Sequence, residues 1–184
     1  QVSIYDKGMV FDLGVSPTLF QDLKIYTSSN SVSEANTFLF GFYDELYYLY
    51  QLQNILSDSD NVIDVGANIG NHTIYFATYL QYDSIVAFEP ILENFELLKK
   101  NTERYFNIWL RNEAVGDSTI DVMMRKNLSN MGACEVDPLG DISVHQVRLS
   151  DIFVPEVSLI KIDVEWYEPQ VLEGAKTLIE EDRP

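Results

Sequence analysis

Acidic side chains stand beside a glycine-containing turn in residues 62–77, which read VIDVGANIGNHTIYFA. Asp64 lies near the end of an apolar run, and Gly66 and Gly70 follow it. Glycine permits a tight turn after a strand, and the first N–H groups of the next helix point at whatever lies in front of them. The pattern predicts a ligand-binding turn between a buried strand and a helix.

Glu89, followed by Pro90, ends the next apolar run, SIVAFEP. An acidic side chain at the end of the second strand of such a sheet can accept hydrogen bonds from both hydroxyls of a ribose. An exposed charge at a strand end is the alternative, and the glycine turn upstream makes it the weaker one. Two ribose-bearing ligands then compete: a nicotinamide dinucleotide and S-adenosylmethionine.

The residues of the turn distinguish these two ligands. A dinucleotide fingerprint, G-x-G-x-x-G, needs its second glycine for close approach to the pyrophosphate. Here Asn68 stands at that place, and Asn71 stands where the third glycine would be. Asp64 would repel a pyrophosphate, whereas it suits a ligand that carries an amino group and a sulfonium. The turn therefore favours S-adenosylmethionine.

The elements that position these residues alternate between strand and helix. Alternation begins at residue 61, continues to IWLRNEAVG, and returns in VSLIKIDV and EPQVLEGAKTLIEE. It predicts a parallel sheet with helices on both faces. Residues 119–149 break the rhythm and predict an antiparallel insertion, and residues 1–60 predict an extended and then helical lead-in.

Composition restricts the function classes. The net charge of -17, from 29 acidic and 12 basic side chains, would repel a nucleic-acid backbone or an anionic membrane, so neither is expected as a partner. A neutral or sugar-like small molecule fits better. The single cysteine excludes an internal disulfide. One cysteine and two histidines also supply few ligands for a metal centre built from these residue types. We expect a cytoplasmic protein.

Five segments, in order, resemble the FkbM family of S-adenosylmethionine-dependent methyltransferases. They are VIDVGANIGNHTIYFA, AFEPILENFELLKKN, NEAVGD, the LSD of VRLSD, and LIKIDVEWYEPQVLEGA, and they cover residues 62 to about 176. The resemblance implies a doubly wound, Rossmann-like class I methyltransferase domain over residues 61–184, after a lead-in segment over residues 1–60. It also implies S-adenosylmethionine as the cofactor.

The resemblance further implies roles for individual residues. Those matching the first motif, which would hold the methionine portion of the cofactor, are Asp64, Gly66, Ala67, Asn68 and Gly70. Glu89, with Pro90 beside it, matches the ribose-binding acid, and the segment beside the adenine is matched by Glu113, Ala114 and Val115. In KIDVE, Asp163 and Glu165 match the fourth-strand motif at the mouth of the active site, where Asp163 also counts as cofactor-binding.

Methyl transfer to a hydroxyl requires an in-line approach, and a base helps because a sugar hydroxyl is a poor nucleophile. Asp163 and Glu165 are the leading candidates for the base, with His72 third. Each has an alternative: Asp163 could orient the cofactor or cap a helix, Glu165 could be a first-turn carboxylate, and His72 could be a surface residue. Magnesium or manganese would suit these carboxylates, although the spacing does not require a metal.

We therefore expect an O-methyltransferase that acts on a hydroxyl of a sugar in a glycan or a glycosylated metabolite. The alternatives are a non-catalytic or accessory methyltransferase-fold module of a larger glycan-synthesis protein and, less favoured, a dinucleotide-dependent oxidoreductase.

Two features depart from the family pattern. Trp166 stands where the family usually has glycine, and its ring would crowd the acceptor pocket or stack on a sugar face. The sequence stops at EEDRP, where a further strand would be expected to cover the sheet edge. We therefore expect a domain cut from a longer polypeptide, whose other domains would be its partners.

Overall fold

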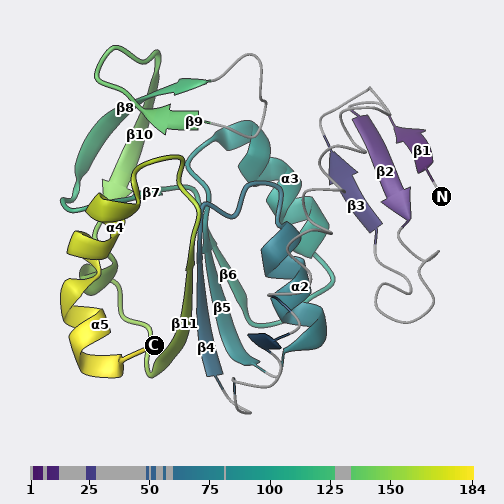
Figure 1. Cartoon of the computed structure of the whole chain (residues 1–184). Helices are drawn as coiled ribbons and strands as arrows, with labels where there is room; N and C mark the ends of the chain where they lie inside the picture. The colour runs from purple at the N-terminus through teal and green to yellow at the C-terminus, as the bar shows by residue number, and fades with distance from the viewer. Residues whose placement is uncertain are drawn as a thin grey trace.

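Four parallel strands form the central sheet of the protein, in the order β11, β4, β5, β6. The computed structural model describes residues 2–5, 8–12, 24–27, 49, 51–52, 56, 60–80, 82–126 and 134–184. The strands are β4 (Asp60–Val65), β5 (Tyr82–Phe88), β6 (Ile108–Arg111) and β11 (Val157–Ile162). The chain runs outward from β4 to β6 and then returns to β11 on the other side of β4, so all four carboxyl ends meet at the upper edge of the sheet in Figure 1.

Helices lie on both sides of this sheet. Helices α2 (Asn71–Tyr79) and α3 (Leu92–Thr102) lie on one side, and α4 (Glu168–Gly174) and α5 (Lys176–Asp182) lie on the other (Figure 1). Strand β4 is apolar on both faces because Val62 packs in one core cluster with α2, while Ile63 and Val65 pack in another with α4 and α5. The prediction of an α/β protein with a parallel sheet and helices is confirmed.

A second sheet lies above the carboxyl ends of the parallel strands (Figure 1). It has the order β7 (Ala114–Val115), β10 (Ile142–Val147), β8 (Ile120–Lys126), β9 (Cys134–Val136), and β10 with β8 and β8 with β9 are antiparallel. The short 3-10 helix η1 (Leu149–Asp151) then leads to β11. Met124 and Cys134 from this sheet share a core cluster with Ile91, which precedes α3. The insertion between β6 and β11 is therefore placed directly over the strand ends.

The described part of the lead-in is a small antiparallel sheet of β1 (Val2–Tyr5), β2 (Gly8–Asp12) and β3 (Lys24–Thr27). Strand β3 is tied to α3 by Asn101, whose Oδ1 accepts the Tyr26 N–H at 2.7 Å and whose Nδ2 donates to the Tyr26 carbonyl at 3.0 Å. Most of the helix predicted for the lead-in lies outside the described residues; Leu49, Gln51 and Leu52 are helical.

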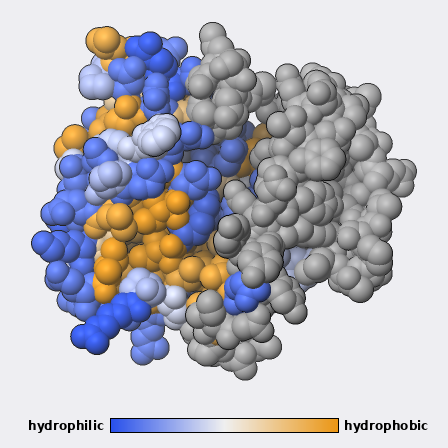
Figure 2. All heavy atoms as spheres, viewed as in Figure 1, coloured by the Kyte–Doolittle hydropathy of each residue, from blue (hydrophilic) through white to orange (hydrophobic). Residues whose placement is uncertain are grey.

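Strand β11 is at the border of the parallel sheet, where β4 is its one partner among the described strands. Its residues Leu159, Ile160 and Ile162 are half-buried. Figure 2 shows apolar surface gathered in the region where Figure 1 places β11, between α5 and the grey segments. The further strand expected beside β11 stays a prediction. Among the described helices, none has the length and apolar character that a membrane crossing requires.

Candidate active site

Two glycines shape the turn between β4 and α2. Gly66 has a φ of 76°, and a Cβ there would lie 1.9 Å from the Asp163 carbonyl oxygen, so a side chain would collide with the backbone after β11. Gly70, immediately before α2, has a φ of 96°, and a Cβ there would meet the Leu98 side chain of α3 at 2.8 Å. The predicted glycine turn is present, and it is packed tightly against its neighbours on two sides.

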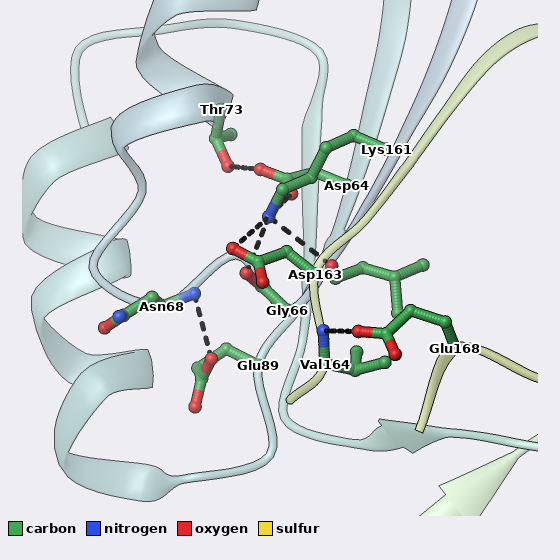
Figure 3. Close-up of polar contacts among 10 residues, drawn as sticks. Asp64, Gly66, Asn68, Thr73, Glu89, Lys161, Asp163, Val164 and Glu168 are labelled. Atoms are coloured by element: carbon green, nitrogen blue, oxygen red, sulfur yellow. Dashed lines mark hydrogen bonds and ion pairs between the residues drawn. The ribbon is translucent and has the colours of Figure 1, made fainter. Parts of the chain in front are cut away.

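Asp64 lies beneath this turn rather than in front of it. Its side chain is fully buried, and Oδ2 accepts a hydrogen bond of 2.6 Å from Thr73 of α2. The Lys161 ammonium lies 3.1 Å from its Oδ1 (Figure 3). Since a buried charge needs a partner, this ion pair accounts for a carboxylate inside the core. Contact of Asp64 with the methionine portion of a cofactor stays a prediction.

Glu89 lies at the carboxyl end of β5 with only 5% of its surface exposed. Its Oε2 accepts the Asn68 N–H at 2.9 Å, and its Oε1 accepts the Ile91 N–H at 2.9 Å. Burial raises the pKa of this carboxyl from 4.5 to about 7, although these hydrogen bonds, one from Asn94 and the charge of Lys161 all act to lower it. Glu89 is therefore close to half-protonated at neutral pH, and it joins the β4–α2 turn to the start of α3.

The acids of the KIDVE segment follow β11 at the same edge. The Asp163 side chain is 64% exposed, and its Oδ2 lies 4.0 Å from the Lys161 ammonium. Partial burial and the neighbouring carboxylates of Asp163, Glu168 and Glu135 raise the pKa of Glu165. Glu168 holds the loop by accepting the Val164 N–H at 3.2 Å (Figure 3). Asp163 and Glu165 thus both lie at the mouth of the site, the first near the Lys161 ammonium and the second among other carboxylates.

The loop between β11 and α4 has an unusual backbone. Glu165 and Trp166 both adopt the left-handed region, with φ values of 50° and 74°. This region favours glycine because a Cβ crowds the backbone there, which gives a physical reason for the glycine that the family pattern usually has at position 166. The Trp166 ring does not fill the pocket, since 88% of its surface is exposed.

A cavity of about 210 Å³ opens between these groups. Its lining residues are Gly66, Asn68, Glu89, Pro90, Ile91, Met124, Cys134, Asp163, Val164 and Glu165. The structure therefore brings together six of the predicted site residues from three strand ends. It adds an apolar wall of Ile91, Met124 and Cys134, which the sequence analysis missed because nothing local indicates that the inserted sheet folds over the pocket.

Other predicted site residues lie outside this lining. Ala67 is buried with Ala87 and Leu98, while Ala114 and Val115 are buried in β7. The Glu113 carboxylate pairs with Arg111 and borders a separate cavity of about 570 Å³ against β5 and β6. His72 is in the first turn of α2 with its ring centroid 6.1 Å from that of Phe76. The cofactor and base roles predicted for these residues stay predictions.

Two supporting residues were not singled out from the sequence. Lys161 is a charged residue within the apolar run VSLIKIDV, which was a visible signal. Asn112 follows β6, and its Nδ2 donates to the Glu89 carbonyl at 2.8 Å and to the Pro90 carbonyl at 3.0 Å, which fixes the backbone at the end of β5. In the described part of the chain, no group of three or more His, Cys, Asp or Glu residues is arranged to hold a metal ion.

Parallel strands with a glycine turn and acidic groups around a pocket at their carboxyl ends define an α/β fold whose pocket lies at the sheet edge where ligands generally bind in such folds. The chain belongs to the FkbM methyltransferase family, because the family described as Methyltransferase FkbM domain matches residues 64–184. The family resemblance seen in the sequence is thereby confirmed.

Two individual proteins are similar to this chain. The hexuronic acid methyltransferase AglP of Haloferax volcanii is 29% identical over 126 residues, which are 64% of this chain and 51% of that protein. The chain thus spans about half the length of this curated relative. Among solved structures, the YcgJ protein from Bacillus subtilis matches with a TM-score of 0.32 and 16% identity, over 39% of this chain and 34% of that one.

Proposed function

We propose that this protein transfers a methyl group from S-adenosylmethionine to a hydroxyl of a sugar in a glycan or glycosylated metabolite. The observation that carries the proposal is the pocket in which the Gly66 turn, the buried Glu89 and the exposed acids after β11 come together. Membership of the FkbM methyltransferase family supports the reaction type, and the name of the hexuronic acid methyltransferase relative supports a sugar acceptor.

The lining of the pocket fits the proposed cofactor. Glu89 Oε2 keeps acceptor capacity for a ribose hydroxyl after its one N–H bond, and a second hydroxyl would replace the long 3.5 Å bond from Asn94 on Oε1. The apolar wall of Ile91, Met124 and Cys134 suits a flat adenine ring, and the absence of a side chain on Gly66 lets a ligand approach the backbone. The bound cofactor would supply a methyl group on a positively charged sulfur, a charge that the acidic surroundings favour.

Glu165 is the better placed of the two proposed bases. Its raised pKa makes it a stronger proton acceptor than an ordinary glutamate, and its side chain lines the pocket. A proton from the acceptor hydroxyl would pass to its carboxylate as the C–O bond forms, and the methyl–sulfur bond would break to release S-adenosylhomocysteine. Asp163, 4.0 Å from Lys161, orients the acceptor by this proposal.

The mouth of the pocket also favours an uncharged acceptor. Glu135 of β9 contributes to the field at Glu165 together with Asp163 and Glu168, so negative charge predominates there. Neutral hydroxyls would form hydrogen bonds with these acids, whereas a free carboxylate would be repelled, so the proposal takes from the name of the relative a sugar acceptor and not its carboxylate. The exposed Trp166 ring supplies an apolar face against which a sugar can stack.

The Glu165→Gln variant tests the proposed reaction. We expect it to lower kcat by about 10²-fold to 10⁴-fold, the usual contribution of a general base, with the affinity for S-adenosylhomocysteine unchanged. The assay follows conversion of S-adenosylmethionine to S-adenosylhomocysteine with a panel of neutral methyl glycosides. Glu173→Gln, an exposed carboxylate of α4, serves as the control and should keep the rate of the unmodified protein. Full activity of Glu165→Gln would reject its role as the base.

A further inference from the structure

Lys161 is the cation at the centre of the acidic edge, and no role has been assigned to it so far. Its side chain, only 15% exposed, projects from β11 next to β4, where the register pairs Lys161 with Asp64. The ammonium lies 2.9 Å from the Gly66 carbonyl oxygen, 3.1 Å from Asp64 Oδ1, 3.5 Å from the Val65 carbonyl oxygen and 4.0 Å from Asp163 Oδ2 (Figure 3). One side chain therefore contacts both the turn and the acid after β11.

The position of the β4–α2 turn is fixed from two opposite sides. On the β5 side, the N–H groups of Gly66 and Ala67 both donate to the Phe88 carbonyl, at 3.0 Å and 2.9 Å. On the β11 side, Lys161 donates to the carbonyl of Gly66. Because the Gly66 α-carbon is already packed against the Asp163 carbonyl, a small rotation of this peptide would change both the shape of the pocket and the direction of the following N–H groups.

A plain ion pair with Asp64 does not account for these contacts. Asp64 has a second partner in Thr73, whose hydroxyl donates to the other carboxylate oxygen at 2.6 Å. Charge compensation alone would require Lys161 near Asp64, but not its shorter contact with a backbone carbonyl of the turn. The bond to the Gly66 carbonyl is a contact that a structural ion pair would not need.

We infer that Lys161 is a positioning residue that holds the glycine turn in its ligand-binding form and aligns it with Asp163. The ammonium donates hydrogen bonds to the turn carbonyls and forms ion pairs with the buried Asp64 and with Asp163, the acid at the acceptor side. The glycine turn, on the proposed cofactor side of the pocket, and Asp163, on the proposed acceptor side, are thereby held at a fixed separation. The identity of the ligand held by the turn rests on the function proposed above, whereas the effect on the turn itself does not.

The first test measures amide hydrogen exchange in the free protein, for Lys161→Met and for Thr73→Val as a matched control. Each variant removes one partner of Asp64, but only the first removes the donor to Gly66. We expect Lys161→Met to speed exchange of residues 67–70 by at least about tenfold relative to Thr73→Val, with similar exchange in α5 for both. Equal acceleration of the turn in the two variants, or acceleration throughout the chain, would overturn the inference.

The second test measures binding of S-adenosylhomocysteine by calorimetry at a temperature where each variant is folded. The double variant Asp64→Asn/Lys161→Met removes both charges of the Asp64–Lys161 ion pair. It should therefore regain part of the thermal stability that Lys161→Met loses. Its affinity for S-adenosylhomocysteine should stay as low as that of Lys161→Met. We expect at least a tenfold weaker Kd for both Lys161 variants and a change of less than threefold for Thr73→Val. Affinity restored in the double variant would show that Lys161 only compensates charge. If the unmodified protein does not bind this ligand, the proposed function fails, and the exchange experiment still decides the role of Lys161.

Discussion

At the scale of single residues, Glu89 combines two roles in one carboxylate. It accepts N–H groups from the β4–α2 turn and from the residue before α3, and it faces the pocket with little contact to water. Burial therefore keeps its pKa near neutrality. A ligand hydroxyl that donates to the ionised form would lower that pKa, so binding and proton release are linked.

The affinity for S-adenosylhomocysteine should consequently depend on pH. If the ligand binds the ionised form of a carboxyl with a pKa of about 7, the affinity rises about tenfold between pH 6 and pH 8. Calorimetric titration across this interval measures the change. Glu89→Gln removes the titrating group and should bind more weakly with no such rise, whereas a rise that survives in Glu89→Gln would assign the titration to another residue.

The same shift predicts the direction of a stability change. The pKa of Glu89 is raised in the folded state, so its contribution to stability is present below pH 4.5 and is lost as the pH rises toward 7. In the free protein, Glu89→Gln should therefore gain stability relative to the unmodified protein over this interval, which denaturant titrations at pH 4.5 and pH 7 can compare.

At the scale of elements, two loops at the strand ends build the site in different ways. The β4–α2 turn uses glycine at its two positions of high positive φ, whereas the loop after β11 places Glu165 and Trp166 in the left-handed region. The second arrangement costs stability, since each such residue is strained by roughly 1 to 2 kcal/mol. The strained, exposed tryptophan follows Glu165, which lines the pocket, so the stacking on a sugar proposed above can be tested by replacing it.

Trp166→Gly should separate stability from acceptor binding. The ring is exposed, so its loss removes little packing, and glycine relieves the left-handed backbone. We expect a gain of about 1 kcal/mol in the free energy of unfolding, together with a raised KM for the sugar acceptor and an unchanged Kd for S-adenosylhomocysteine. Trp166→Ala, which loses the ring but keeps the Cβ, should show the raised KM without the gain in stability. An unchanged KM in both variants would rule out stacking on this ring.

The sequence predicted the local elements of the site better than their assembly. The turn at Gly66 and Gly70 and the acid at the end of β5 follow from patterns within a few residues, and the structure places them at one sheet edge. The burial of Asp64 against Lys161, by contrast, depends on the register of β11 with β4, which a local pattern does not specify. The placement of Met124 and Cys134 over the pocket depends likewise on long-range packing of the second sheet.

At the scale of the whole molecule, charge and sheet order point to the same end of the protein. The net charge of -17 leaves few cations, and at the pocket Lys161 is already shared between Asp64, Asp163 and the turn. The pocket is lined by residues of the β4–α2 turn, the end of β5, the loop after β11 and the inserted sheet. By the function proposed above, a ligand with positive charge and ribose hydroxyls would bind in this pocket.

The central claim, that this pocket binds S-adenosylmethionine, is tested most directly by calorimetric titration of the purified protein with S-adenosylmethionine, S-adenosylhomocysteine and NADH in parallel. We predict saturable binding of the first two in the micromolar range and none of NADH, since a pyrophosphate would face the acids at the turn. Binding of NADH alone would support a dinucleotide-dependent oxidoreductase instead. Binding of none of the three would contradict the claim and indicate a methyltransferase-fold module without cofactor binding of its own.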